Sequence, residues 1–255
     1  MSFGLNLYSI RNLMQTEESF LSAAKRLKAA GYSYLQFSGS PLGAESIKRV
    51  SEETGMPVVL THMPMERILR DTDALMQEHL LYGCKNIGLG MMPVDILLDE
   101  ARFKKTVEEL NRAAEHMEKS GFRFFYHHHH FEFYRHGKET ALGYMLENAP
   151  HINFTADTYW MQYGGVDVLS WLKRMKGRIA CVHLKDYAIA RTADGGLTPM
   201  FAPVGDGVMD FDAILAEMKT LGVEYYLVEQ DNAPDREDAI AEVCRSAIYL
   251  KGRNL

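Results

Sequence analysis

The segments CKNIGLG (84–90), DEARFKKTVEELNRAAEHMEKSG (99–121) and FRFFYHHHH (122–130) follow one another without interruption by another pattern. The first and the third are short apolar runs, which are typical of buried strands. The second is long and has apolar residues at helical spacing. The order strand, helix, strand is that of a β/α repeat, so the next question is how often it recurs.

The same order recurs along the rest of the chain. In the first half, the predicted strands and helices are FGLNLYSIR (3–11) and EESFLSAAKRLKAAG (17–31), YSYLQFSG (33–40) and AESIKRVSEETG (44–55), MPVVLTHMP (56–64) and DTDALMQEHLLYG (71–83). In the second half, KETALGYMLENA (138–149) is the fifth helix, and it is followed by INFTADTYW (152–160) and VDVLSWLKRMKG (166–177), RIACVHLKD (178–186) and FDAILAEMKTLG (211–222), EYYLVEQ (224–230) and DREDAIAEVCRSAIYLKG (235–252). Eight such units predict a (β/α)₈ TIM barrel, an α/β fold, as a single domain over residues 1–255.

An open, doubly wound sheet is the alternative fold. It would normally carry a glycine-rich turn of the GxGxxG type after the first strand, and SIRNLM (9–14) is not such a turn. The one long stretch without a clear pattern is 187–210, which has several glycines and two prolines. In a barrel it follows the seventh strand, and we expect it to lie over the barrel mouth as a loop or lid.

Composition limits the possible partners. The chain has 255 residues, of which 47% are hydrophobic and 24% charged, and 28 Lys and Arg face 34 Asp and Glu for a formal charge of −6. This balance argues against a surface that binds a nucleic acid backbone. Three distant cysteines predict reduced thiols, and neither a signal peptide nor a membrane span is recognised, so we expect a cytoplasmic protein without a membrane partner.

Polar side chains follow four neighbouring predicted strands at their carboxyl ends. The fifth strand ends in the histidine run, the sixth at Asp157, the seventh reaches His183 and the eighth reaches Glu229. The carboxyl ends of barrel strands form one rim, where the catalytic groups of such barrels lie. Since successive strand residues face opposite sides, Asp157 and His183 fall on the polar, inward face. Mixed imidazole and carboxylate ligands suit a divalent metal, although each residue alone could serve as a helix cap or a solvated side chain.

The chain resembles the xylose isomerase-like barrels, which include sugar phosphate isomerases and epimerases, inosose dehydratase and, more distantly, endonuclease IV. The resemblance rests on LYSIR (7–11), THMP (61–64), YHHHHFEF (126–133), ADTYWMQYGGVD (156–167), VHLKDY (182–187) and VEQD (228–231). It implies one divalent ion, with Mn²⁺ as first choice among Mn²⁺, Zn²⁺, Mg²⁺, Co²⁺ and Fe²⁺. It also implies that Asp157, His183 and Glu229 are three of the ligands.

The fourth ligand, from the fifth strand, is where this chain departs from the family pattern. The family places a glutamate at the strand end, and here the first carboxylate is Glu132, after the histidines. Either Glu132 is the fourth ligand, which is the interpretation we prefer, or His127 or His129 replaces it. By alternation, His127 and His129 share one face of the strand.

The resemblance implies a metal-dependent isomerase or epimerase that acts through an enediolate on a sugar, a keto-sugar or a sugar phosphate. Glu132 and Glu229 could form the proton-transferring pair of an epimerase, or His129 could act as the acid or base. Expelling a leaving group would instead give a dehydratase or lyase of the inosose dehydratase type. His62, His127, Lys185 and Trp160 are the expected substrate contacts, with Tyr159, Phe131 and Phe133 as further wall residues or plain core.

Two other functions fit the same fold. A DNA-repair enzyme of the endonuclease IV type needs additional metal ligands and a basic groove. The acidic balance of the chain argues against nucleic acid as a partner and therefore against DNA repair. A non-catalytic sugar-binding protein would bind the ligand without exchanging its protons with solvent. Self-association into a homo-oligomer is compatible with the sequence, which identifies no surface for it.

Overall fold

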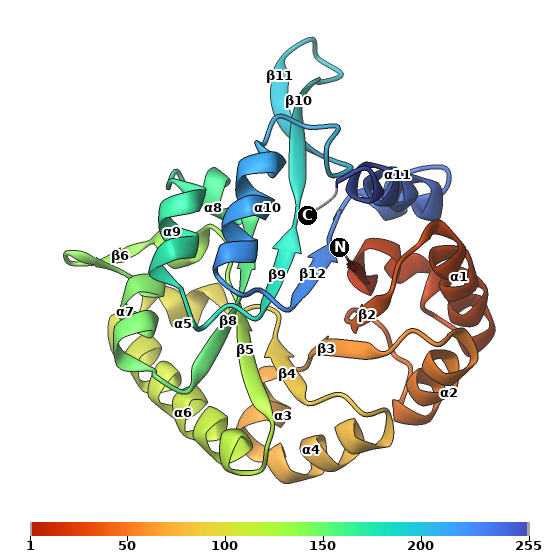
Figure 1. The fold of residues 1–255 in the computed structure, drawn as a ribbon. Coiled ribbons are helices and arrows are strands. Elements are labelled where there is room, and N and C mark those ends of the chain that lie inside the picture. Colours follow the sequence, from red (N-terminus) through yellow and green to blue (C-terminus); the bar gives the residue numbers. More distant parts are fainter. Residues whose placement is uncertain (1, 254–255) are drawn as a thin grey trace.

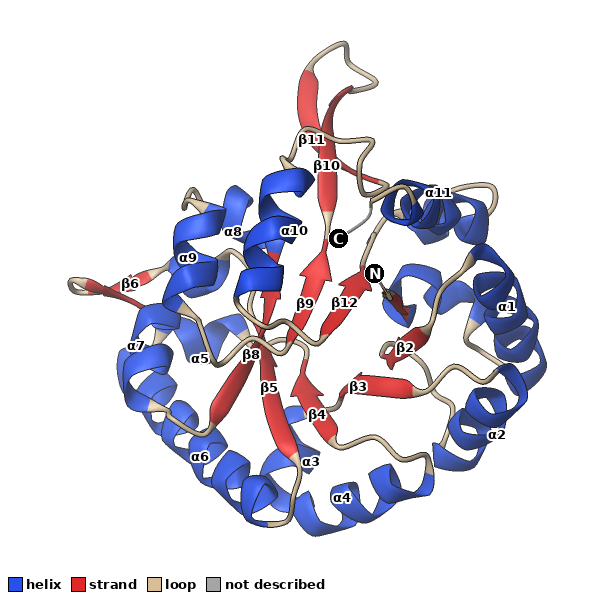
Figure 2. Cartoon of the chain, viewed as in Figure 1, coloured by secondary structure: helices blue, strands red, loops and turns tan. Residues whose placement is uncertain are grey.

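The computed structural model describes residues 2–253, and in this range eight parallel strands close into a barrel (Figures 1 and 2). Going around the barrel, the strand order is β1, β12, β9, β8, β5, β4, β3, β2. Their bounds are β1 Gly4–Asn6, β2 Tyr34–Phe37, β3 Val58–His62, β4 Asn86–Leu89, β5 Arg123–His127, β8 Ile152–Asp157, β9 Cys181–Leu184 and β12 Tyr225–Val228. The prediction of a (β/α)₈ TIM barrel is confirmed.

Helices surround the strands as an outer ring (Figure 2). They are α1 Glu17–Ala30, α2 Ala44–Thr54, α3 Met65–Arg70, α4 Thr72–Leu81, α5 Val94–Leu98, α6 Glu100–Lys119, α7 Ala141–Asn148, α8 Thr158–Tyr163, α9 Val168–Arg174, α10 Phe211–Thr220 and α11 Ala239–Lys251. Short 3₁₀ helices are η1 Leu7–Leu13, η2 Phe131–Phe133 and η3 Ala233–Asp235, and two short strands, β6 Arg135–His136 and β7 Glu139–Thr140, form a small hairpin.

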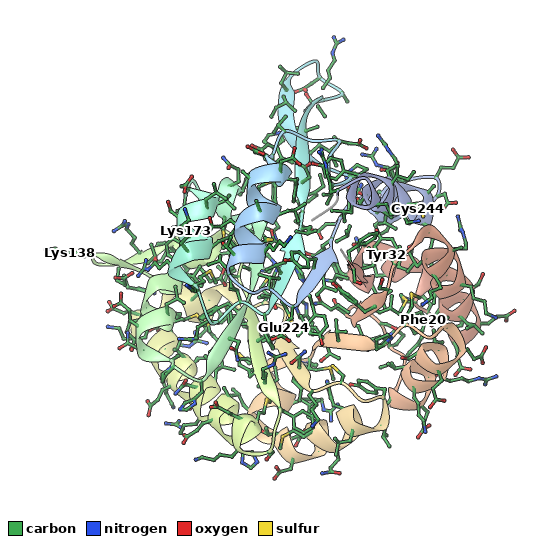
Figure 3. The ribbon with its side chains drawn as sticks, in the orientation of Figure 1. Phe20, Tyr32, Lys138, Lys173, Glu224 and Cys244 are labelled. Atoms are coloured by element: carbon green, nitrogen blue, oxygen red, sulfur yellow. The ribbon has the colours of Figure 1, made fainter. Side chains whose placement is uncertain are left out.

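Helix α1 illustrates how the sequence sets these elements. Thr16 caps its first turn by accepting a hydrogen bond from the backbone N–H of Ser19, and Gly31 ends it in the left-handed region at φ 101°. Phe20, Ala24 and Leu27 fall on one face and are fully buried against the barrel. Figure 3 shows the labelled Phe20 within the packed ring, whereas charged side chains such as those of surface lysines extend outward.

The segment after the first strand differs from the prediction. We expected a strand over 3–11, but β1 ends at Asn6 and the chain continues as η1. The reason is local, because the Asn6 side chain accepts a hydrogen bond from the backbone N–H of Tyr8 at 3.2 Å and so caps a helical turn. The early turn directs the chain over the rim of the barrel.

The stretch 187–210 also differs from the prediction of an irregular loop. Most of it forms an antiparallel hairpin of β10 Asp186–Arg191 and β11 Leu197–Ala202, which projects away from the barrel (Figure 1). Gly195 supplies the left-handed turn residue at φ 89°. Only the root of the hairpin approaches the mouth, so the segment is an arm rather than a cover.

Alternation along the strands divides the barrel interior into an apolar floor and a polar rim. Phe125 precedes His127 by two residues, and Cys181 and Leu227 likewise precede His183 and Glu229, so each pair shares the inward face. The floor is a separate buried cluster consisting of Tyr34, Val59, Leu60, Phe125, Cys181 and Leu227. The opposite faces pack between the strands and the outer helices in the larger core. The polar residues at the carboxyl ends of the strands therefore lie on one side of this floor, and Asn86, Arg123 and Glu224 form a separate hydrogen-bonded group at the amino ends.

Two further observations complete the description. The three cysteines, Cys84, Cys181 and Cys244, carry free thiols. Among the helices of residues 2–253, none combines the length and the apolar character that crossing a membrane requires.

Buried His79 gives a pH-dependent prediction for stability. Its ring bonds Thr61 Oγ1 at 2.8 Å and the Leu75 carbonyl at 2.7 Å, and burial lowers its pKa from 6.5 to about 4. Because the folded chain protonates His79 less readily than the unfolded chain, its contribution is present above pH 6.5 and is lost as the pH falls toward 4. We expect the free energy of unfolding of the wild type to fall by about 3 kcal/mol more than that of His79→Gln between pH 7 and pH 4. Urea unfolding at both pH values measures this, and equal losses would contradict it.

Candidate active site

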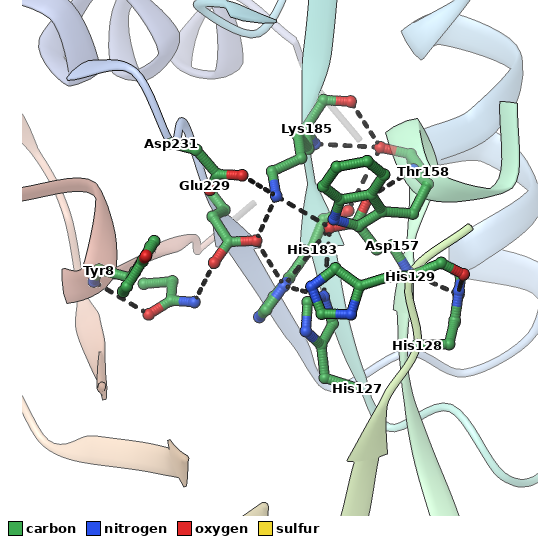
Figure 4. A network of polar contacts seen from close by, with 12 residues as sticks. Tyr8, His127, His128, His129, Asp157, Thr158, His183, Lys185, Glu229 and Asp231 are labelled. Atoms are coloured by element: carbon green, nitrogen blue, oxygen red, sulfur yellow. Dashed lines mark hydrogen bonds and ion pairs between the residues drawn. The ribbon is translucent and has the colours of Figure 1, made fainter. Parts of the chain in front are cut away.

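Four buried side chains converge at the polar end of the barrel (Figure 4). His127 is the last residue of β5, Asp157 is the last residue of β8, His183 lies in β9, and Glu229 directly follows β12. One ligand-type atom from each lies within 4.8 Å of the others. The structure thus brings together the three residues predicted from the strand ends, and it adds His127 as the fourth.

The contacts inside this cluster are short. His183 Nδ1 lies 3.0 Å from Glu229 Oε2 and 3.6 Å from Asp157 Oδ2. His127 Nε2 lies 3.1 Å from His183 Nδ1 and 3.4 Å from Asp157 Oδ2. Two imidazoles and two carboxylates are a donor set that suits Zn²⁺, Fe²⁺, Co²⁺ or Mn²⁺.

Glu229 provides a test of whether these residues fit a cation. Its Oε2 atom is buried and, within residues 2–253, lacks a hydrogen bond of good geometry, although it forms ion-pair contacts. Buried polar atoms normally have a hydrogen-bond partner. A buried carboxylate oxygen without one, with three other ligand-type atoms close by, is typical of a metal ligand. The cluster therefore fits a divalent ion.

Lys185 lies beside the cluster as a buried cation. Its Nζ is 2.8 Å from Glu229 Oε2, 3.0 Å from Asp231 Oδ2 and 3.6 Å from Asp157 Oδ2 (Figure 4). Burial alone would lower the pKa of Lys185, but the three carboxylates raise it above its usual value. The ammonium group thus compensates part of the negative charge.

The same charges set the protonation states of the ligand-type residues. Burial alone would raise the pKa of Asp157 and of Glu229, but Lys185 and the neighbouring histidines lower both, so both side chains are ionised. Burial alone would lower the pKa of His183, whereas Glu229 and Asp157 raise it to about 9. A metal ion at this cluster would therefore have to displace a proton from His183.

Asn6 and Gln36 orient the cluster, and the sequence reasoning missed both. Asn6 Nδ2 donates to Glu229 Oε1 at 2.5 Å. Gln36 Oε1 accepts from His183 Nε2 at 2.7 Å, which directs His183 Nδ1 at the cluster, and Gln36 Nε2 lies 2.9 Å from His62 Nε2. The sequence feature that could have indicated them is a single polar residue inside an otherwise apolar strand, as in YLQF (34–37).

Glu132 lies outside the cluster, which corrects the preferred interpretation of the fourth position. Its carboxylate is fully buried, and it accepts hydrogen bonds from the Tyr126 hydroxyl and from the His129 backbone N–H, both at 2.7 Å. The cause is that β5 ends at His127 and η2 turns the chain back on itself, so Glu132 faces the protein behind the strand. His127 takes the place that we expected for Glu132.

The histidine run divides as alternation predicts. His127 and His129 both line the cavity at the mouth, with ring centroids 4.6 Å apart. His128 faces the other way, and its Nε2 accepts from the Asp157 backbone N–H at 3.1 Å. His130 packs against Trp160 with ring centroids 5.2 Å apart. Only alternate members of the run therefore face the cavity.

This cavity has a volume of about 410 Å³ and contains several of the predicted substrate contacts. His62, His127 and Lys185 line it together with His129 and Glu229. Gly90, directly after β4, lies close to this wall, and a Cβ there would lie 3.0 Å from the His62 ring, so a side chain at this position would press on His62.

The aromatic residues that we expected in the cavity wall lie around the cavity rather than along it. Trp160 is not a lining residue, and its ring packs against Lys185 Nζ at 4.9 Å and against the His129 ring at 5.2 Å. Phe131 stacks on His129 at 5.2 Å, and Phe133 packs on Trp171. Tyr159 is buried against Phe201 at the root of the hairpin. These rings hold the cavity residues in place.

Replacing Glu132 with glutamine separates a supporting role from a ligand role. The amide introduced by Glu132→Gln would accept only one of the two hydrogen bonds, so we expect the free energy of unfolding to fall by about 1–3 kcal/mol. Metal content after dialysis against Mn²⁺ should stay at the wild-type value. Loss of the metal in a Glu132→Gln protein that remains folded would show that Glu132 reaches the cluster after all.

Comparison with known proteins agrees with the architecture. A family profile described as xylose isomerase-like TIM barrel matches residues 24–250. A solved sugar phosphate isomerase/epimerase from Parabacteroides distasonis is similar with a TM-score of 0.83 and 22% identity, covering 99% of this chain and 94% of its own. Two more solved structures, 3-keto-D-glucoside 4-epimerase from E. coli (TM-score 0.70, 16% identity, 99% and 100% covered) and a probable 3-DHS dehydratase from Bacillus anthracis (0.72, 12%, 100% and 100%), have the same fold. No curated protein sequence matches the chain.

Proposed function

This chain belongs to the xylose isomerase-like TIM barrel family, and we propose that it is a divalent-metal-dependent isomerase or epimerase of a sugar or keto-sugar. The observation that carries the proposal is the cluster of His127, Asp157, His183 and Glu229 beside a cavity that His129 also lines. Two of the similar solved structures are described as an isomerase/epimerase and an epimerase, and a third as a dehydratase.

The four clustered residues would hold the metal ion. A divalent ion bound there would polarise a sugar carbonyl and an adjacent hydroxyl, and would acidify the C–H bond between them. Asn6 and Gln36 hold two of the four side chains in orientation, through Glu229 and His183. Lys185 keeps the carboxylates of Asp157 and Glu229 ionised.

Glu229 and His129 are the residues that would move the proton. Glu229 is an ionised carboxylate on the cavity wall, so it can accept a proton from a substrate carbon. Burial first, and then the neighbouring His127 and Lys185, lower the pKa of His129 to about 2, so its imidazole is neutral and would readily give up any proton that it accepts from the substrate. Its Nδ1 is buried without a hydrogen-bond partner in the described part of the chain. Whether Glu229 or His129 returns the proton to the substrate would determine the product.

A lyase of the dehydratase type is the second candidate, and the position of Glu132 favours it. The carboxylate pair Glu132 and Glu229 that we expected for an epimerase does not form, because Glu132 faces away from the cavity. An imidazole, His129, stands at the cavity instead. Once an imidazole has accepted the carbon-bound proton, it can deliver that proton to a departing hydroxyl group.

Solvent exchange tests the proposal and separates the two candidates. The Mn²⁺-loaded protein is incubated in deuterated water with a panel of keto-sugars, and mass spectrometry and NMR follow the products. An isomerase or epimerase yields a product of unchanged formula with one carbon-bound deuterium, whereas a lyase yields a product that has lost water. If no member of the panel takes up deuterium and none gives a product, both candidates are contradicted.

His129→Gln is the matched variant for this assay. We expect it to slow exchange by at least about 100-fold, as loss of a general base does, without changing Mn²⁺ binding. His130→Gln is the control, because His130 is the next residue and does not line the cavity.

A further inference from the structure

The cavity has two chemically different sides. One carries the clustered residues together with His129, Lys185 and Asp231. The other is built by the end of β4 and by the segments that follow β3 and β4, and it includes Met63, Pro64, Met65, Leu89 and Met91. Tyr8, Ser38 and His62 complete the side chains of the lining. A ligand that fills the cavity therefore meets charged groups on the side of the cluster and mainly apolar side chains on the side of β3 and β4.

Apolar side chains are also exposed in the part of the chain that follows the lining residue Met91. Met91 is 49% exposed, and the chain that follows it exposes Val94 at 40% and Leu98 at 53% on α5. Scattered apolar residues on a surface are ordinary, but exposed apolar residues that gather beside a ligand cavity are typical of a binding surface, and here Met91 both lines the cavity and is exposed. Methionine suits this role because its side chain adapts to irregular apolar shapes.

Charge at the polar side argues against a phosphate group. Asp157, Glu229 and Asp231 surround Lys185, which is the one cation among the described residues that line the cavity. Three carboxylates and one ammonium leave two negative charges, and one divalent ion would balance them. The site would then be neutral, with no net positive charge to hold the dianion of a phosphate ester.

Arg11, which contacts the lining residues Tyr8 and Asp231, is already engaged in hydrogen bonds. Arg11 donates from one guanidinium nitrogen to the backbone carbonyls of Tyr8 and Asp231, both at 3.0 Å. Its guanidinium lies over the Tyr8 ring, 4.3 Å from the centroid, and Arg11 is not a lining residue. Arg11 thus supports the cavity wall and offers the interior no charge.

Resting on the proposed function, we propose that the cavity takes an uncharged sugar that carries an apolar substituent, such as an aryl group, and not a sugar phosphate. The sugar ring lies toward the clustered residues, and the substituent lies along Met63, Leu89 and Met91. The volume of about 410 Å³ is at the smaller end of ligand cavities, so the substituent would extend toward the exposed methionine at the rim.

Calorimetry with matched ligand pairs tests this inference. The Mn²⁺-loaded protein is titrated with the methyl and phenyl β-glycosides of D-glucose and D-galactose, and with glucose 6-phosphate and galactose 6-phosphate. We expect one phenyl glycoside to bind at least ten times more tightly than its methyl partner, and both phosphates to bind more weakly than that methyl glycoside. Equal affinities within both pairs, tighter binding of either phosphate, or no binding of any glycoside would each overturn the inference.

Variants locate the contact. Met91→Ser and Met63→Ser should each reduce the advantage of the phenyl glycoside by at least threefold, because each should weaken binding of the phenyl glycoside more than that of the methyl glycoside. Ile248→Ser is the control, because Ile248 is 72% exposed on α11 and lies outside the cavity lining. If a phosphate binds tightly and Arg11→Met abolishes its binding, the rim arginine is a phosphate site and the inference is wrong.

The test of the substrate class and the test of the proposed enzyme function can fail independently of each other. Deuterium exchange into keto-sugars reports the proton-transfer chemistry, whereas the phenyl-to-methyl affinity ratio reports the apolar side of the cavity. Exchange together with equal glycoside affinities would leave the enzyme proposal intact and remove only the substrate class. A phenyl preference without exchange into any keto-sugar would support the cavity assignment and count against the enzyme.

Discussion

Asp157→Asn is expected to lower Mn²⁺ affinity by at least about 100-fold, since loss even of a residue that only orients a ligand costs 10–100-fold. The substitution removes a charged ligand while leaving an oxygen that can still cap α8, as Asp157 Oδ1 now does for the backbone N–H of Trp160 at 2.9 Å. Asp157→Ala removes the cap as well, and should cost about 1 kcal/mol more in unfolding free energy. Metal analysis after dialysis and calorimetric titration measure the affinity, and urea unfolding measures the stability.

Asp186→Asn is the matched control for this experiment. Asp186 is also fully buried and follows β9 closely, but it accepts hydrogen bonds from the backbone N–H groups of Gly205 and Gly207 and is not part of the cluster. The variant should therefore lose stability and keep its metal. A full equivalent of metal in both Asp157→Asn and His183→Ala would refute the proposed site.

Lys185→Met is expected to destabilise the metal-free protein by about 3 kcal/mol or more, because it removes one of the two positive charges, Lys185 and protonated His183, that face the buried carboxylates. Asp157 and Glu229 would then be left with His183 alone, and Asp231, which is 26% exposed, would add to the repulsion between carboxylates. Mn²⁺ supplies the missing positive charge, so it should restore more stability to the variant than to the wild type. Urea unfolding with EDTA and with Mn²⁺ measures both effects.

Lys173→Met is the control for the loss of a lysine. Lys173 is 60% exposed and pairs with Glu217 at 3.4 Å, so its removal should change the unfolding free energy by less than about 1 kcal/mol. If Lys185→Met were no more destabilising than Lys173→Met in EDTA, the proposed charge balance of the site would be wrong.

Much of the site could be predicted because its residues follow a simple rule of position. Asp157, His183 and Glu229 each stand at the carboxyl end of a strand, and a closed parallel barrel brings those ends to one rim whatever the details of packing. Alternation then selected the inward face, which also separated His127 and His129 from His128.

The rest depended on contacts between segments far apart in the chain. Asn6 and Gln36 reach Glu229 and His183 across 223 and 147 residues, so no local pattern reveals the pairing. The choice between His127 and Glu132 depended on the residue at which β5 ends and on the Tyr126 hydroxyl that holds Glu132 behind the strand.

The sequence by itself determined the barrel and the rim at which the polar strand-end residues meet, because apolar periodicity sets strands and helices locally and eight such repeats are typical of a closed barrel. Tertiary structure alone decided that His127 completes the cluster, that Lys185 lies among three carboxylates, and that one side of the cavity is mainly apolar. These are properties of distances between side chains from different strands and loops. Such distances, and the burial and charge that follow from them, exist only once the barrel has closed.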